Sequence, residues 1–391
     1  MKMNIKFVKN NLTELNSYVG FIVLLISMYV FESTAWTSFN DSFFHDVLLG
    51  CALLFAISCM VLKKFSLKEK FVFGILMCIG VLCYISTRFT GLLLTFLVVT
   101  LIPRNSIDKV FRIIFIEELF LTICIILLSL IGVLPNQVVE INKSLYTANA
   151  YTFGFSHPNI LTAQATTIVF LYLCVNRNNI QFKTILISLL STLVIYYFSR
   201  GRTAFLLSLL VIILICIDKT GKFNSIKSSI FKYLPYLNIG IILTILIVIV
   251  LFAFFGGHSR LINLINDVIF NGRIGLAWLN FKAYSMSLFG VNLDPNVWGE
   301  WQYHALDNGH MMIFLQYGIV GFISYFCVVQ RALNNIAKRK DIVMCIIISV
   351  LLIWLIYEGT MSYVGKNFTL LFAFYRGKSG LKKKGVKQNV T

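Results

Sequence analysis

Apolar runs of membrane-span length recur along the whole chain, and short polar segments separate them. We predict twelve spans, at residues 17–32, 44–62, 71–87, 90–102, 113–134, 159–176, 184–198, 203–217, 236–255, 309–330, 342–357 and 364–375. A helix rises about 1.5 Å per residue, so the runs at 90–102 and 364–375 are short for a hydrocarbon core of roughly 30 Å, and a re-entrant path is an alternative for both. The pattern predicts an all-α integral membrane protein.

The composition excludes an ordinary soluble domain. Of the 391 residues, 58% are hydrophobic and 13% are charged, whereas a soluble domain is about half apolar and about a quarter charged. The nine cysteines all fall within apolar runs, so the sequence indicates no disulfide framework. We therefore expect residues 1–391 to form a single polytopic membrane domain whose core is the bundle of spans.

The positions of the basic residues predict the orientation. If the N-terminus is cytoplasmic, most of the 34 lysines and arginines fall on inner segments, including the basic tail 376–391. This bias follows the positive-inside rule and predicts that both termini are cytoplasmic. Orientation and contact with anionic membrane lipids explain the net charge of +18, so no nucleic-acid partner is expected. The basic residues left outside are Arg88, Lys143, Arg200, Arg202, Arg260, Arg273, Lys282 and Lys366.

Three polar clusters open spans that enter the membrane from the predicted outer side. They are Gly-Phe-Ser-His-Pro-Asn at 154–159, Ser-Arg-Gly-Arg-Thr at 199–203 and Asp-Asn-Gly-His at 307–310. A helix N-terminus presents free N–H groups and the positive end of its dipole, which favours phosphate. Pro158 suits a first helical position, with Ser156 or His157 as the cap. If the three ends converge, they form an electropositive pocket.

Arginines in the predicted outer segments are the candidates for binding phosphate. Arg200 and Arg202 occupy a turn too short to let them move far, and a guanidinium binds phosphate oxygens bidentately. Snorkelling toward lipid headgroups is the alternative reading. The large extracytoplasmic loop predicted at 256–308 adds Arg260 and Arg273, the latter in an Asn-Gly-Arg sequence.

The candidate general bases lie near the third cluster. Asp307 precedes Asn308, and its carboxylate could accept a proton from a sugar hydroxyl; capping the helix is the alternative role. His304, His310 and, at the first cluster, His157 could act as bases or hydrogen-bond donors, or could be structural. Asn159 and Asn308 supply polar groups at two of the predicted helix starts.

The motifs resemble the polysaccharide repeat-unit polymerases (Wzy type) and the related O-antigen ligases. The likeness covers the span layout of the whole chain. It is sharpest at 154–159, at 199–202, and at Asp307-Asn308 followed by Gly-Ile-Val-Gly at 318–321. The sequence contains no P-loop, Asp-x-Asp, His-Glu-x-x-His or Gly-x-Gly-x-x-Gly motif. This pattern indicates a substrate that carries its own activation, without metal, nucleotide or other cofactor.

The resemblance implies a GT-C-like fold in a bacterial plasma membrane and a glycosyltransferase that joins undecaprenyl-diphosphate-linked oligosaccharide repeats at the outer face. Its partners would be a flippase and a chain-length regulator of the same pathway. Arg200, Arg202 and Arg273 would bind the diphosphate. Related ligases carry a His-Asn pair where this chain has Asp307-Asn308, which makes Asp307 the first candidate base and His304 or His310 the second, and weakens the ligase reading.

A flippase or exporter of lipid-linked oligosaccharide is the rival hypothesis. A transporter needs charged groups near the membrane midplane. Glu117 and Glu118 are expected close to the cytoplasmic end of their span, which leaves the span centres nearly free of charge and favours the enzyme.

Overall fold

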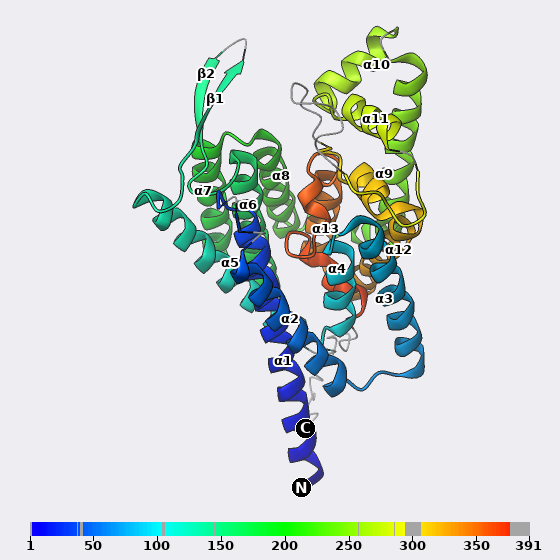
Figure 1. Ribbon diagram of the computed structural model, residues 1–391. Helices are drawn as coiled ribbons and strands as arrows, with labels where there is room; N and C mark the ends of the chain where they lie inside the picture. Colours follow the sequence, from blue (N-terminus) through cyan, green and yellow to red (C-terminus); the bar gives the residue numbers. More distant parts are fainter. Residues whose placement is uncertain are drawn as a thin grey trace.

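The chain is a helical, multi-pass membrane protein. The computed structural model describes residues 2–36, 38–39, 42–103, 106–143, 146–256, 258–284, 286–293 and 306–375 (Figure 1). In these residues, eight helices are long and apolar enough to cross a membrane. They are α1 (Lys2–Glu32), α2 (Phe43–Leu62), α3 (Leu67–Thr87), α5 (Ile107–Leu130), α6 (Pro158–Val175), α7 (Phe182–Ser199), α9 (Lys227–Phe255) and α12 (Gly309–Arg339).

Three further helices coincide with predicted spans. α4 (Gly91–Leu101) and α13 (Ile342–Trp354) are short and apolar, and nearly all of their residues are buried by the helices around them. α8 (Arg202–Lys219) has charged residues at both ends. Each predicted apolar run except the last therefore corresponds to an α-helix. Among the described residues, eight of these helices have the length and composition of a membrane span, so four of the twelve predicted spans are not supported in this way.

The last predicted span, 364–375, is not an α-helix. The chain there forms the 3₁₀ helix η5 (Phe368–Ala373), and another 3₁₀ helix, η4 (Gly359–Ser362), precedes it; both pack against α12. Non-helical backbone at membrane depth requires partners inside the protein. The Asn335 amide donates to the carbonyls of Phe372 (2.8 Å) and Ala373 (3.0 Å), and the Tyr325 hydroxyl donates to Ser362 O (2.9 Å).

The two long polar segments lie at the same end of the bundle, here named the hairpin end (Figure 1). β1 (Val138–Lys143) and β2 (Tyr146–Tyr151) pair as antiparallel strands, here called the hairpin, a small addition to the expected all-α fold. The predicted loop 256–308 contains α10 (Arg260–Leu264), a π turn η2 (Ile265–Ile269) and α11 (Arg273–Ala283). The N-terminus of α1 lies at the opposite end.

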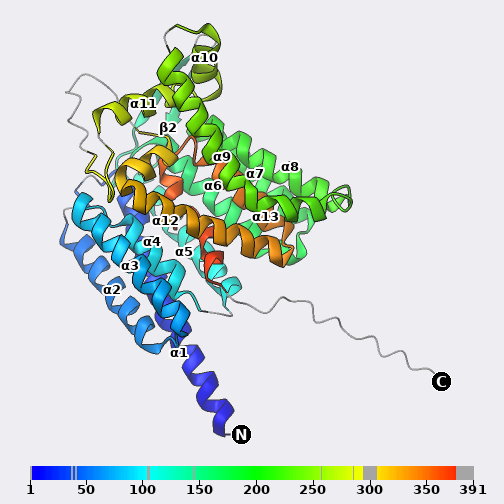
Figure 2. The ribbon, with the colours of Figure 1, turned by 90° about the vertical axis from the view of Figure 1, so that its right-hand side faces the viewer.

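The helices pack in two groups that share the centre of the bundle (Figures 1 and 2). On one side α5, α6, α7 and α8 follow one another, and α1 packs on α2 and α5. On the other side α12 contacts α3 and α9, and α3 contacts α4. α13 contacts α8 and α9 and thereby joins the two groups. The side chains of α2, α3, α7 and α9 are largely exposed, as lipid-facing helices require.

α12 changes direction at Gly318, which has a φ of 70° and a ψ of −177°. The residues after α11 pair with the broken turn: Ile319 N donates to Ser287 O, and Val320 N donates to Leu288 O, both at 3.0 Å. A Cβ on Gly318 would lie 2.3 Å from Gly290 N. Only glycine fits both the positive φ and this close approach.

The expected position of the acidic pair on α5 is wrong. α5 begins at Ile107, not at 113, so Glu117 and Glu118 lie near its middle, roughly 17 Å from either end at 1.5 Å per residue. Lys366, expected in an outer loop, is instead buried and interacts electrostatically with Glu118. The argument from uncharged span centres therefore fails.

Candidate functional site

The N-termini of α6, α8 and α11 converge at the hairpin end on one small cavity of about 50 Å³, here named the arginine pocket. That volume is several times the roughly 10–15 Å³ that a single water needs. Both arginines of the pocket are first residues of helices, Arg202 of α8 and Arg273 of α11. The pocket is lined by Asn159, Thr162, Gly201, Arg202, Thr203, Ala204, Arg273, Trp354, Tyr357 and Glu358.

The start of α6 is organised as its sequence predicts. His157 is the N-cap, and its Nδ1 accepts a hydrogen bond from Asn159 N at 3.1 Å. Pro158 follows at the first helical position, where its missing N–H costs nothing. With its ring nitrogen engaged by the backbone, His157 fixes the turn that presents Asn159 to the pocket.

The turn between α7 and α8 separates its two arginines. Arg200 is the C-cap of α7 in the left-handed conformation (φ 55°), and its guanidinium lies 5.1 Å from the ring centroid of Tyr197. Arg202 lines the pocket, and its side chain is exposed. The snorkelling alternative therefore fits the surroundings of Arg200, which lies on an exposed tyrosine, better than those of Arg202.

Arg273 is held by the backbone on one side and by a carboxylate on the other. Its Nε donates to Tyr357 O at 2.9 Å, and its Nη2 lies 3.4 Å from Asp307 Oδ2. The turn before α11 is fixed by Asn266, whose Oδ1 accepts from Gly275 N at 2.9 Å. A guanidinium has five N–H donors, so Arg273, which lines the pocket, has donors beyond those that contact Tyr357 and Asp307.

The start of α12 assigns different roles to Asp307 and Asn308. Asn308 is the N-cap, because its Oδ1 accepts from the backbone N–H groups of His310 and Met311, each at 3.1 Å. The capping alternative for Asp307 is therefore wrong. Its carboxylate instead faces Arg273 and is about one-third exposed.

Burial and neighbouring charges shift the pKa values at this end. Burial raises the pKa of Asp307, although Arg273 and His157 oppose the shift. Burial also lowers the pKa of His157, opposed by Asp307. Burial and then the charge of Asp307 raise the pKa of Glu358 to about 7. The pocket thus combines two arginines with the carboxyl group of Glu358, and Asp307, which does not line the pocket, adjoins it through its contact with Arg273. Both carboxyl groups have an increased proton affinity.

Glu358 and Tyr357 were not among the predicted site residues. Both follow α13 and are brought to the pocket by the close approach of α13 and α12, where Gly309 N donates to Leu355 O at 2.9 Å. The one sequence feature that could have indicated Glu358 as a site residue is its position as a single carboxylate directly after an apolar run and before Gly359. This signal does not identify the neighbours of Glu358.

Two predicted residues lie away from the pocket, and a third falls outside the described part of the chain. Arg260 is an exposed residue at the start of α10, which packs on α9 and η2. His310 is buried, with its ring 5.4 Å from that of Phe326, and both ring nitrogens lack a hydrogen-bond partner among the described residues. His304 lies in the segment 294–305, outside the described residues.

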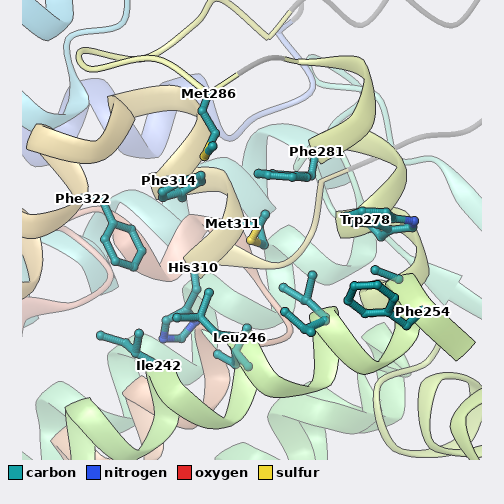
Figure 3. A pocket seen from close by; sticks show the side chains of 14 residues that line it. Ile242, Leu246, Phe254, Trp278, Phe281, Met286, His310, Met311, Phe314 and Phe322 are labelled. Atoms are coloured by element: carbon teal, nitrogen blue, oxygen red, sulfur yellow. The ribbon is translucent and has the colours of Figure 1, made fainter. Parts of the chain in front are cut away.

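His310 lines a second cavity, here named the apolar groove, between α9, α11 and α12 (Figure 3). Its volume is about 490 Å³. Figure 3 shows Trp278, Phe281, Phe314 and Met311 around this space, with His310 among them. It is lined by Ile242, Ile245, Leu246, Ile249, Val250, Ala253, Phe254, Trp278, Phe281, Met286, His310, Met311, Phe314 and Phe322.

α11 connects the arginine pocket with the apolar groove. Its first residue, Arg273, lines the pocket, whereas Trp278 and Phe281 line the groove. Leu246 and Phe254 of α9, which also line the groove, have exposed side chains on the flank of the bundle that a membrane would surround. The arrangement offers an anion-binding end and a hydrocarbon-compatible end on the two sides of one short helix.

Comparisons with protein-family models, with curated proteins and with solved structures found no match to this chain.

Proposed function

We propose that this protein is a Wzy-type polymerase that joins oligosaccharide repeats carried on undecaprenyl diphosphate, with the hairpin end on the extracytoplasmic side. The observation that carries the proposal is the pairing of the arginine pocket with the apolar groove across α11. Such a pair fits an amphiphile with an anionic head and a long hydrocarbon chain. The excess of basic residues on the opposite segments supports the orientation.

The arginine pocket suits the diphosphate. Arg202 and Arg273 supply charged N–H donors, and the N-termini of α6, α8 and α11 add positive potential. During transfer the diphosphate departs with the electron pair of its bond to the anomeric carbon. Donors fixed before the reaction stabilise the charge that grows on this leaving group, and one such donor is typically worth 10²–10³-fold in rate.

Asp307 is the proposed general base. Its carboxylate lies beside Arg273, and burial increases its affinity for a proton. In the reaction the hydroxyl oxygen of the acceptor sugar bonds to the anomeric carbon of the donor, and its proton passes to the carboxylate. Glu358, whose pKa is about 7, is placed to accept the proton next. The step needs neither a metal nor a nucleotide.

A flippase or exporter of the same lipid is the second candidate, and a specific observation favours it. Glu118 and Lys366 lie buried near the middle of the bundle, where transporters carry charged groups. An O-antigen-ligase-type transfer would use the same pocket. The polymerase, the flippase and the ligase differ in the product that each would form from the lipid-linked repeat.

The decisive experiment uses purified protein and a lipid-linked repeat in detergent or vesicles. We expect a ladder of longer glycans, and Asp307→Asn should remove it while the protein still unfolds at the wild-type temperature. Movement of the labelled repeat across the vesicle bilayer without a ladder would refute the polymerase hypothesis and support the flippase hypothesis. Transfer of one glycan to a different acceptor, without a ladder, would support the ligase.

A further inference from the structure

A third cavity lies between α1, α5, α6 and the C-terminal segment, and we name it the polar cavity. Its volume is about 290 Å³, near the lower limit of ligand pockets, roughly 300–1,000 Å³. It extends from Glu32 and Ser156, at the hairpin end, to Glu118 and Lys366, near the middle of the bundle. It is lined by Ile26, Tyr29, Val30, Glu32, Ser33, Phe89, Glu118, Ser156, Ile160, Ala163, Thr360, Tyr363, Gly365 and Lys366.

The inner end of the polar cavity holds a charge pair. Glu118 is 1% exposed and Lys366 is 7% exposed, and their opposite charges attract each other. The Gln164 amide donates to Glu118 Oε2 at 3.4 Å. The Lys366 ammonium has no hydrogen-bond partner among the described residues, although it lines the cavity. A buried ammonium without hydrogen bonds is costly, so its position indicates a polar occupant.

The walls of the cavity are aromatic. The rings of Tyr29 and Tyr363 stack with an interplanar angle of 12° and centroids 5.8 Å apart, and the Phe89 ring lies 5.8 Å from that of Tyr363. The Tyr29 hydroxyl is buried and also lacks a partner in the described chain. Apolar ring faces with a few unpaired polar groups suit a ligand that has both C–H faces and hydroxyl groups.

The wall between the polar cavity and the arginine pocket is one turn of chain thick. Thr360 lines the polar cavity, and its hydroxyl donates to Glu358 Oε1 in the arginine pocket at 3.2 Å. The start of α6 also separates the two cavities. Ser156, before the helix, and Ile160 line the polar cavity, whereas Asn159 and Thr162 line the arginine pocket. The outer end of a ligand in the polar cavity would therefore lie next to residues that also form the arginine pocket.

We propose that the polar cavity binds the terminal sugar of the acceptor glycan, the chain end whose hydroxyl is glycosylated. The proposal rests on the proposed polymerase function. A lone anion would meet Glu118, a lone cation would meet Lys366, and a hydrocarbon chain would leave both unsolvated. A neutral polyhydroxylated ring satisfies the ammonium, the carboxylate and the Tyr29 hydroxyl together, and its C–H face fits the stacked rings.

The test separates the two substrates. The donor is a lipid-linked repeat with its non-reducing-end hydroxyls methylated, so that it can only donate. The acceptor is the same repeat as a water-soluble methyl glycoside without diphosphate, so that it can only accept. Glu118→Gln combined with Lys366→Met removes the charge pair without leaving a lone buried charge, and Tyr29→Phe removes a single hydroxyl. Lys282→Met, an exchange on α11 outside the polar cavity, is the matched control.

We expect the double variant to raise the acceptor KM at least tenfold and Tyr29→Phe to raise it several-fold, with the donor KM unchanged within twofold. The control should change neither constant. An unchanged acceptor KM in Tyr29→Phe and in the folded double variant would overturn the assignment of the cavity. No transfer by the wild-type protein would refute the proposed function itself.

Discussion

Two buried arginines at opposite ends of the bundle have contrasting surroundings. Arg177, at the end away from the hairpin, donates to Asp341 Oδ2 (2.9 Å) and Cys174 O (2.8 Å) and pairs with Asp108, and its side chain is 6% exposed. Arg273, at the hairpin end, is 12% exposed, yet it has one backbone acceptor and one carboxylate at 3.4 Å. Arg273 also lines the arginine pocket, whereas each guanidinium nitrogen of Arg177 donates a hydrogen bond to an acceptor in the protein.

Arg177 and Arg273 are similarly buried, so their hydrogen-bond partners, and not their burial, distinguish a structural arginine from a binding one. At Arg177 each of the three guanidinium nitrogens donates to an acceptor, and these acceptors belong to the ends of α5, α6 and α13. At Arg273 the protein fixes the guanidinium with part of its fork, and the side chain lines the same cavity as Arg202. Two like charges beside one cavity are unfavourable until an anion occupies it.

The largest expected effect is the loss of transfer on changing Arg273. Arg273→Ala should lower the rate of ladder formation by about 10²–10³-fold, because one donor to the leaving diphosphate is lost. Initial rates with purified protein and lipid-linked repeat measure this effect. Arg88→Ala is the control, since Arg88 is an exposed arginine that ends α3 and lies outside the arginine pocket. A normal ladder in Arg273→Ala would contradict the proposal that Arg273 binds the diphosphate.

The next effect is on stability. Arg177→Gln should lower the free energy of unfolding by about 3 kcal/mol, because it leaves Asp341 without its cationic partner in a largely buried position. Thermal unfolding in detergent measures the change. The specific activity of the protein that stays folded should match the wild type. If Arg177→Gln instead unfolds normally and loses transfer, the two arginines would have been assigned to the wrong roles.

The parts of the site that depend on local chemistry could be predicted from the sequence. The cap at His157, the proline at the start of α6 and the positions of Arg202 and Arg273 follow from residues that are neighbours in the chain. Arg200 and Arg202 are equivalent by composition alone. The left-handed backbone at Arg200 gives the two side chains different surroundings, and the residue types in that turn do not predict this conformation.

The parts that depend on packing could not be predicted. Glu358 joins the pocket through the approach of α13 to α12, and Lys366 reaches Glu118 across more than two hundred residues of sequence. The apolar run at 364–375 has the composition of a span, but α12 satisfies its backbone from outside and the segment does not need to become an α-helix. The start of α5 was predicted too late because its first turns carry charged residues, which moved the acidic pair toward the wrong end.

The smallest effect is a pH dependence at the arginine pocket. Glu358 is partly buried, and burial together with the charge of Asp307 raises its pKa to about 7, above the 4.5 of an ordinary glutamate. Folding therefore favours its protonated form, so its contribution to stability is complete below about pH 4.5 and is lost as the pH rises to 7. The wild type should lose roughly 1–2 kcal/mol relative to Glu358→Gln between pH 5 and pH 8. Taking the difference between the two proteins cancels the titrations of groups that do not interact with Glu358. Parallel stability curves for the two proteins would mean that Glu358 is ionised throughout, and its role as second proton acceptor would then fail.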